Sequence, residues 1–340
     1  MFLYLTKHAL QLNKQGWTIV ITDNETKVKR KIPFNSIEWV VVFWRIQLTT
    51  DVITSFLKAK TPVFFLSKYW SYFGKLDSIE IKNVELLYKH IEMSTNSSTS
   101  FEYAKTIILS KINNSITMLM RWARFDFFHQ KDLIEFGRII EKLKEYKTKV
   151  IKANSKEEIR WYEGNSAKEY FKAFWMFLPD GFEFTKRTRR PPRDKINAML
   201  SLWYTLLAQT IQMILNIQGI EAQLWFFHKP KDLRTLLVLD MMEMYRSWII
   251  DDMVIRILSK EAIKQEHFFV NTKNEKRPVL FTNEWLQIFL REYYKSVFSK
   301  SDEENFWNYK KLSLIEKDLE IFKQSLLKTD PNIYEGFKIK

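Results

Sequence analysis

Four acidic or imidazole side chains stand in otherwise apolar surroundings between residues 161 and 246: Glu163, His228, Asp240 and Glu243. Glu163 begins a helical pattern whose apolar positions recur through residues 167–174, so its carboxylate is predicted on the buried face of that helix. Burying an unpaired carboxylate costs roughly several kcal/mol, so such groups are paired, protonated or bound to a metal. A bound divalent cation is the simplest explanation for this group of residues.

Asp240 and Glu243 are three residues apart in the run 236–245, which is apolar almost all round and predicts a buried helix. His228 follows the apolar stretch 224–227 and precedes this acidic helix. A lone histidine is more often structural than a metal ligand. The prediction that His228 binds a metal therefore rests on its acidic neighbours. Oxygen ligands with one imidazole suit Mg²⁺ or Mn²⁺ better than zinc.

A basic segment, residues 184–195, lies between the acidic elements, and six of its twelve residues are Lys or Arg. Its two prolines prevent a continuous helix, and Asp194 can cap the helix that follows. Guanidinium groups held in such a loop suit phosphate contact; the alternative is a solvated charged surface. The predicted DNA-binding residues are Lys186, Arg187, Arg189, Arg190 and Arg193.

The elements that must position these residues predict an α+β multidomain fold. Residues 1–80 form a small β-rich, β-sandwich-like domain, with strands at 17–22, 37–43 and 62–66 and one helix at 49–60. Residues 81–100 are predicted to be a linker and loop, including the polar run 94–100. Residues 101–340 form a larger all-α catalytic domain, with helices at 101–126, 130–147, 163–177, 194–217, 233–259, 283–298 and 308–327.

Composition narrows the function classes. The chain has 340 residues and no cysteine, which excludes disulfides, zinc–thiolate sites, iron–sulfur clusters and a cysteine nucleophile. A formal charge of +14 favours a polyanionic partner, nucleic acid before an acidic membrane surface, although a lysine-rich composition also arises from AT-rich coding. The stretch 202–220 contains Gln and Asn, so we expect a core helix and no membrane span. The lack of cysteine fits a reducing cytoplasm, where we expect the protein.

The motifs, taken in order, resemble the Cas1 family of CRISPR-associated endonucleases, the adaptation integrases. The resemblance rests on Trp161-Tyr162-Glu163-Gly164-Asn165-Ser166-Ala167, Lys186-Arg187-Thr188-Arg189-Arg190-Pro191-Pro192, Asn197-Ala198-Met199-Leu200, Phe227-His228 and Leu239-Asp240-Met241-Met242-Glu243-Met244-Tyr245-Arg246. Weaker matches are Ala104-Lys105, Lys111-Ile112-Asn113-Asn114 and Tyr334-Glu335-Gly336-Phe337. Many relatives have Asp-Pro and a Gly before the histidine, where this chain has Glu221-Ala222 and Trp225.

The resemblance implies that Glu163, His228 and Glu243 are the catalytic metal ligands for Mg²⁺ or Mn²⁺, with Asp240 an acidic position beside them. It implies that the 3′-hydroxyl of captured double-stranded DNA attacks a phosphodiester of the CRISPR repeat. It also implies a homodimer, formed through the N-terminal β domain, that works with the small partner Cas2.

Two other function classes stay open. One is a transposase of the same fold in a mobile element, which a neighbouring gene for Cas2 or a repeat array would distinguish from an adaptation integrase. The other is a catalytically silent DNA-binding scaffold, against which the Glu163, His228 and Glu243 set argues.

Overall fold

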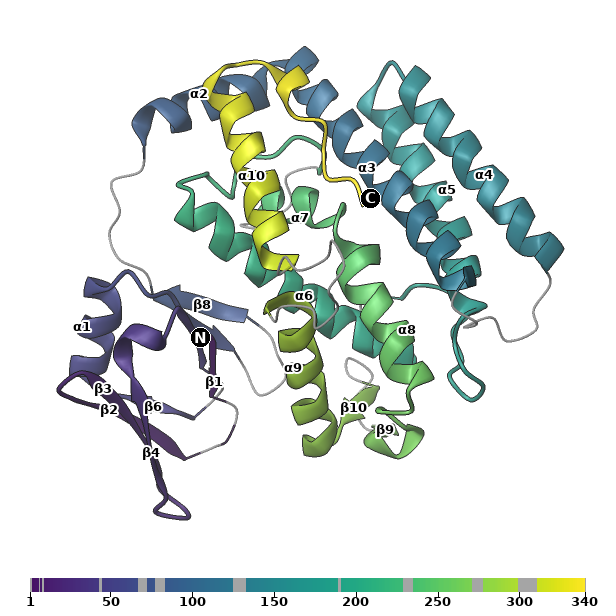
Figure 1. The fold of residues 1–340 in the computed structure, drawn as a ribbon. Helices are drawn as coiled ribbons and strands as arrows, with labels where there is room; N and C mark the ends of the chain where they lie inside the picture. The colour runs from purple at the N-terminus through teal and green to yellow at the C-terminus, as the bar shows by residue number, and fades with distance from the viewer. Residues whose placement is uncertain are drawn as a thin grey trace. The chain divides into compact units, whose positions relative to one another are not determined.

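The structure, a computed structural model, describes residues 2–5, 7, 9–42, 45–66, 72–76, 83–124, 133–188, 191–228, 235–270, 278–298 and 311–339. The chain forms two compact units, Met1–Lys82 and Asn83–Lys340, which are described separately (Figure 1).

The N-terminal unit contains two four-stranded sheets. One sheet has the order β1 (Phe2–Leu5), β5 (Trp39–Val42), β7 (Val63–Leu66) and β8 (Tyr72–Leu76). The other has the order β4 (Lys29–Pro33), β3 (Thr18–Asp23), β2 (Leu10–Gln15) and β6 (Gln47–Leu48). In the first sheet β1, β5 and β7 are parallel and β8 is antiparallel to β7. In the second, only the β2–β6 pair is parallel.

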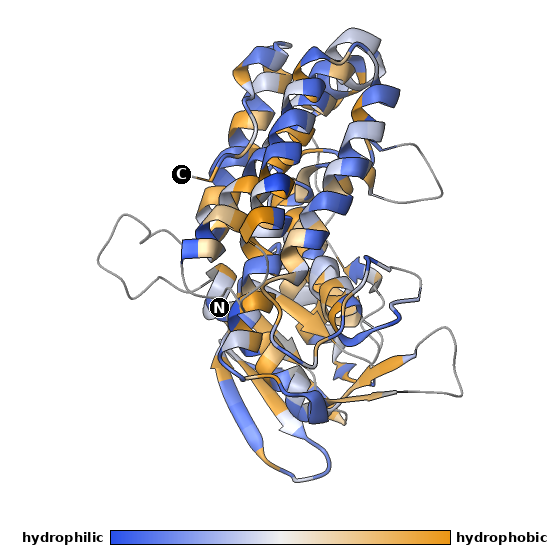
Figure 2. Cartoon of the chain, turned by 90° about the vertical axis from the view of Figure 1, so that its right-hand side faces the viewer, coloured by the Kyte–Doolittle hydropathy of each residue, from blue (hydrophilic) through white to orange (hydrophobic). Residues whose placement is uncertain are grey.

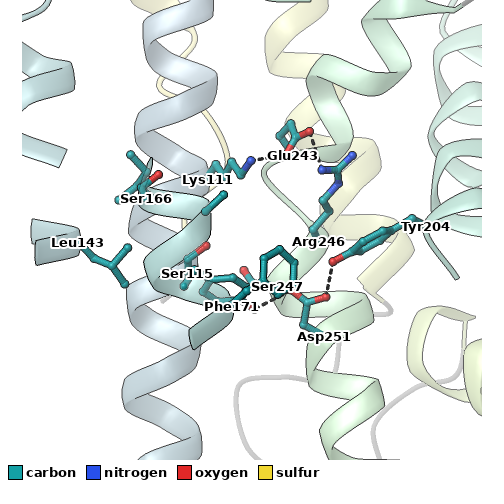
Figure 3. Close-up of a pocket in the computed structure, with 13 residues that line it drawn as sticks. Lys111, Ser115, Leu143, Ser166, Phe171, Tyr204, Glu243, Arg246, Ser247 and Asp251 are labelled. Carbon is teal, nitrogen blue, oxygen red and sulfur yellow. Dashed lines mark hydrogen bonds and ion pairs between the residues drawn. The ribbon is translucent and has the colours of Figure 1, made fainter. Parts of the chain in front are cut away.

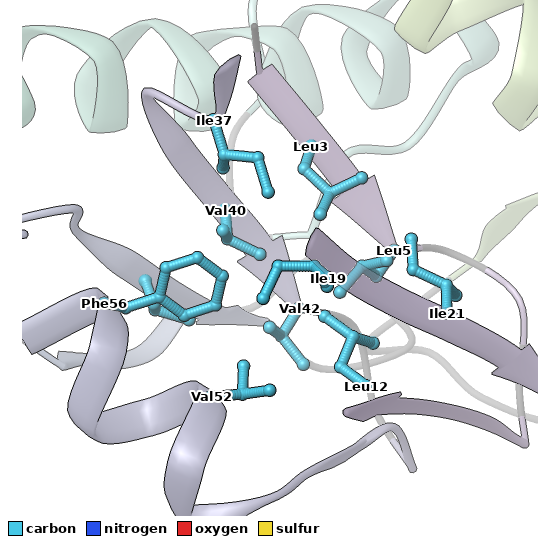
Figure 4. Packing of buried hydrophobic residues seen from close by; sticks show 11 residues of the cluster. Leu3, Leu5, Leu12, Ile19, Ile21, Ile37, Val40, Val42, Val52 and Phe56 are labelled. Atoms are coloured by element: carbon cyan, nitrogen blue, oxygen red, sulfur yellow. The ribbon is translucent and has the colours of Figure 1, made fainter. Parts of the chain in front are cut away.

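One hydrophobic core joins the two sheets and helix α1 (Thr50–Lys58). Leu5 of β1, Ile19 of β3, Val40 of β5 and Phe56 of α1 all belong to it (Figure 4). All four residues of β5 are buried, as expected of a central strand with both faces covered. The predicted β-rich, sandwich-like N-terminal domain is therefore confirmed.

The second unit is mainly helical, also as predicted. Its helices are α2 (Val84–Thr95), α3 (Ser97–Arg124), α4 (Leu133–Lys152), α5 (Lys156–Trp175), α6 (Lys195–Ile217), α7 (Leu236–Met242), α8 (Asp252–Ser259), α9 (Asn283–Phe298) and α10 (Lys311–Leu327). The expected loop at 94–100 is wrong, because these residues end α2 and begin α3. Asn96 makes the break and its side chain accepts the backbone N–H of Ser98 and Thr99, so the polar run caps a helix.

Helices α3, α4 and α5 pack side by side (Figure 1). Both hydrophilic and hydrophobic residues occur along the helices of this unit, which is typical of helices with one buried face (Figure 2). Helix α6 is long and apolar enough to cross a membrane, but 78% of its most apolar window is buried inside the structure. That burial is the behaviour expected of a core helix.

The prediction of one continuous helix over 233–259 is wrong. Within residues 235–259, α7 ends at Met242, and the N–H groups of residues 243–245 bond to carbonyls three residues earlier. A π-helical turn, Ser247–Asp251, then leads into α8. The unit is also not purely helical, because β9 (Phe268–Val270) and β10 (Val279–Phe281) form an antiparallel pair.

Candidate active site

Two of the predicted ligands meet at a lysine. The Nζ of Lys111, from the middle of α3, donates to Oε1 of Glu163 on α5. The same Nζ lies 2.7 Å from Oε2 of Glu243, which follows α7 (Figure 3 shows this second contact). Burial opposes the charge on Lys111, but the two carboxylates outweigh it and raise the pKa above 10.5. Glu163 and Glu243, 80 residues apart in sequence, are therefore held together by one ammonium group.

Glu243 carries a second cation. Its Oε1 lies 2.7 Å from Nη1 of Arg246, and its side chain is only 4% exposed. Burial alone would raise the pKa of Glu243, but the charges of Arg246, Lys111 and His228 outweigh it and lower the pKa to about 2. Glu243 is therefore an ionised carboxylate whose charge two basic side chains balance.

Asp240 accepts hydrogen bonds from the backbone, whereas Glu243 pairs with basic side chains. Its Oδ2 accepts the backbone N–H of Phe226 (2.8 Å) and Phe227 (3.0 Å), and its Oδ1 accepts the N–H of His228 (3.0 Å). Oδ1 also contacts Nδ1 of the His228 ring. Asp240 thus uses both oxygens to position the histidine, in the way carboxylates orient metal-binding histidines from behind. Asp240, predicted as an acidic position beside the ligands, therefore bonds to residues 226–228 through both of its oxygens.

The chain around His228 is clamped on several sides. The Phe226 ring packs 4.4 Å from the Tyr103 ring and stacks 5.6 Å from the ring of buried His90. Nη2 of Arg160 donates to the carbonyl of Phe227 (3.1 Å). Glu221-Ala222 stands where many relatives have Asp-Pro. The Glu221 carboxylate fits this position, since it accepts the N–H of Gln223 (3.2 Å) and closes the turn.

The residues at this site have oxygen donors that suit a divalent cation, but they are not arranged as a complete ligand set. Among the residues that the structure describes, no three His, Asp or Glu side chains form a ready-made metal-binding group. The donor chemistry still fits a hard divalent cation, because two carboxylates converge on one cationic atom. With Nδ1 of His228 held by Asp240, Nε2 is the ring nitrogen left for a ligand. The three-ligand set of Glu163, His228 and Glu243 stays a prediction.

Behind Lys111 a cavity of about 40 Å³ extends to Asp251, with room for a few water molecules. Asp251 accepts hydrogen bonds from the hydroxyls of Tyr170 and Tyr204, each at 2.6 Å. Arg246 lies over the Tyr204 ring, 4.9 Å from its centroid. A chain of contacts therefore runs from Glu243 through Arg246 and Tyr204 to Asp251 (Figure 3).

The basic segment 184–195, called the cationic loop from here on, contains residues with different surroundings. Lys186 and Arg193 are exposed. Arg187 is instead bound to α6, since Nη1 donates to Oδ1 of Asn197 (2.7 Å) and Nη2 donates to Oγ of Ser201 (3.1 Å). The predicted cap is confirmed, because Asp194 Oδ1 accepts the N–H of Asn197 (2.7 Å). Arg189 and Arg190 lie outside the described residues.

Sequence reasoning gave no role to Lys111, Arg246 or Asn114. Asn114 joins three segments at the site: Nδ2 donates to the carbonyls of Met244 and Phe337, each at 2.9 Å, and Oδ1 accepts the N–H of Ile339. All three residues lie in motifs that resemble the Cas1 family. That resemblance was the signal in the sequence that could have identified them. A lysine or arginine on a helix normally faces water, so residue type alone did not identify them.

Comparison with known proteins decides the family. The family model described as CRISPR associated protein Cas1 matches residues 3–295. The chain belongs to the Cas1 family.

A relative in Thermus thermophilus, named CRISPR-associated endonuclease Cas1 3, is 27% identical over 266 residues, 78% of this chain and 76% of the relative. Among solved structures, a casposase bound to integration product has a TM-score of 0.79 at 18% identity, covering 100% of this chain and 96% of the casposase chain. A Cas6-RT-Cas1–Cas2 complex has a TM-score of 0.83 at 22% identity, covering 100% of this chain and 36% of the other. These structural similarities show a shared Cas1 fold.

Proposed function

We propose that this chain is a divalent-cation-dependent DNA endonuclease and integrase of CRISPR adaptation. It joins the 3′-hydroxyl ends of captured double-stranded DNA to the CRISPR repeat by transesterification. The observation that carries this proposal is the meeting of Glu163 and Glu243, from separate helices, on one cationic atom. Membership of the Cas1 family supports the same conclusion, since a curated relative is named an endonuclease.

In this proposal Glu163, His228 and Glu243 hold Mg²⁺ or Mn²⁺. When bound, that ion supplies charge neutralisation at the scissile phosphate. Asp240 fixes the ring of His228 and leaves Nε2 as the atom that binds the ion or accepts a proton from the attacking hydroxyl. Arg246 holds the Glu243 carboxylate in place.

The partners follow from the same proposal. Double-stranded DNA is the substrate, a homodimer places two active sites on one DNA fragment, and Cas2 is the partner protein in the cytoplasm. The solved complex that contains both Cas1 and Cas2 supports this choice of partner.

The test is strand transfer by the purified full chain, using a 3′-hydroxyl DNA fragment and a repeat-containing plasmid in Mg²⁺ or Mn²⁺. Glu163→Gln, His228→Ala and Glu243→Gln are each expected to lower the rate at least about 100-fold, because each removes a group that acts on the transition-state charge. Glu169→Gln is the matched control. Glu169 lies on α5 and pairs with Lys172 at 2.8 Å, away from Lys111, so this variant should keep the wild-type rate.

Wild-type integration by any of the three variants would remove that residue from the proposed ligand set. A transposase of the same fold is the second candidate, favoured by the likeness to a casposase. A plasmid with the repeat replaced by unrelated DNA distinguishes the two, since an adaptation integrase should prefer the repeat.

A further inference from the structure

Lys111 occupies the position where the two carboxylates converge. Its side chain is 13% exposed, and its Nζ contacts one oxygen of Glu163 and one of Glu243. A bound Mg²⁺ requires carboxylate oxygens at about 2.0–2.1 Å. Nζ of Lys111 lies where a cation would bridge these two oxygens, and the two cannot occupy that point together. Lys111 must therefore withdraw before a cation can bind both carboxylates.

The charges of this cluster already balance. Glu163 and Glu243 contribute two negative charges, and Lys111 and Arg246 contribute two positive charges. Charges interact strongly in such partly buried surroundings. Exchanging the Lys111 ammonium for a divalent cation adds one net positive charge to the cluster, which is unfavourable without another anion. Cation uptake by the protein alone should therefore be weak.

Within the part of the chain that the structure describes, neither Asp240 nor Asp251 provides the missing anion. Both oxygens of Asp240 accept backbone N–H groups of residues 226–228. Both oxygens of Asp251, at the far end of the cavity, accept tyrosine hydroxyls. The displaced Lys111 ammonium, on its flexible stem, must find its anion in a bound molecule. For a protein that acts on DNA, a backbone phosphate has the required charge.

We propose that Lys111 is a positioning residue that makes divalent-cation uptake depend on DNA. This inference rests on the proposed function. Without DNA the ammonium group holds Glu163 and Glu243; with DNA it pairs with a phosphate, and the cation takes the carboxylate oxygens. Because coupling between two ligands is reciprocal, bound cation should tighten DNA binding by the same factor.

The test is Mn²⁺ binding at pH 8, measured by calorimetry and by the electron paramagnetic resonance signal of free Mn²⁺, with and without a DNA duplex. Lys111→Met in the full chain should bind Mn²⁺ about tenfold more tightly than wild type without DNA. Adding the duplex should tighten wild-type binding by about tenfold and change the variant little. The matched control is Lys105→Met on the same helix, where Nζ lies over the Phe101 ring, and it should behave as wild type.

Equal Mn²⁺ affinities of wild type and Lys111→Met without DNA would overturn the inference, as would absence of Mn²⁺ binding by the variant. If Lys111→Met does not fold, Lys111→Gln carries the same expectation, because it also removes the charge. A failure of the proposed function is distinguishable: wild-type protein would then lack strand transfer while Lys111→Met still bound Mn²⁺ more tightly.

Discussion

At the scale of single residues, the buried acids differ in what stabilises them. Backbone N–H groups satisfy Asp240, two basic side chains balance Glu243, and two tyrosine hydroxyls bind Asp251. The expectation that buried acids here need a metal was therefore incomplete, because the protein supplies a partner for each of these three. The metal proposal rests instead on the convergence of Glu163 with Glu243.

Asp251 gives a prediction about pH. Burial raises its pKa to about 6, although the bonds from Tyr170 and Tyr204 oppose the rise. The folded state therefore holds this proton more tightly than the unfolded state, whose ordinary value is 3.8. The stabilisation is present below pH 3.8 and is lost as pH rises to about 6, a change of roughly 3 kcal/mol. Asp251→Asn, which does not ionise, should lack this dependence.

Urea unfolding of both proteins at pH 4, 5, 6 and 7 measures the difference. The stability of Asp251→Asn relative to wild type should increase between pH 4 and pH 6 and stay level above it. Asp318, whose pKa burial also raises to about 6, is present in both proteins and cancels in the comparison. A difference that does not vary with pH would refute the assignment.

At the scale of elements, short interruptions of helices place the site. The tight turn after Met242 positions Glu243, and the π-helical turn Ser247–Asp251 brings Asp251 between two tyrosines. π-helical turns occur frequently at functional sites. The apolar periodicity of this segment predicted helix and burial but not these interruptions, because tertiary contacts decide where a helix tightens or widens.

The cationic loop should contain residues with two separable roles. The exposed pair Lys186 and Arg193 is free to reach a DNA backbone, so replacing both by alanine should weaken binding to all sequences alike. The dependence of log affinity on log salt should fall by about 0.9 for each lost phosphate contact. Arg187→Ala should instead lower stability by about 1–3 kcal/mol, since it removes the guanidinium donor to Ser201 and one of the two donors to Asn197 Oδ1.

Fluorescence anisotropy of labelled duplexes over a range of salt concentrations measures the first effect, and thermal unfolding measures the second. An unchanged salt dependence in the double variant would show that Lys186 and Arg193 belong to a solvated charged surface.

At the scale of the whole molecule, we expect a homodimer through the N-terminal unit. In that unit β8 is an edge strand, and Phe73 on it is 67% exposed. An edge strand with an exposed apolar side chain is a ready site for pairing with another chain. Two catalytic units at a fixed separation would then join both ends of one DNA fragment.

Light scattering of the full chain at micromolar concentration should give twice the mass of one chain. Phe73→Asp should shift the protein toward the monomer, because it places a charge in the proposed interface. Trp17→Asp is the control: Trp17 is 78% exposed, but it lies in the turn between β2 and β3 of the other sheet. A monomeric wild-type protein would contradict the dimer.

The sequence alone determined the type of the longer helices and of strands β3, β5 and β7, because periodicity and capping are local. The predicted helix 283–298 has the bounds of α9, and the predicted cap Asp194 is the cap of α6. It also identified Glu163, His228 and Glu243 as unusual, since charge in an apolar pattern is visible without a structure.

Only the tertiary structure decided what those residues contact. Lys111 is 52 residues from Glu163 and 132 from Glu243, so their meeting depends on how α3, α5 and the turn after α7 pack. From the sequence, Asp240 and Glu243 look like one acidic pair. In the folded chain Asp240 accepts backbone N–H groups, whereas Glu243 pairs with two basic side chains. The physical reason is that a buried charge is stabilised by whichever groups the fold brings to it, and those groups come from distant parts of the chain.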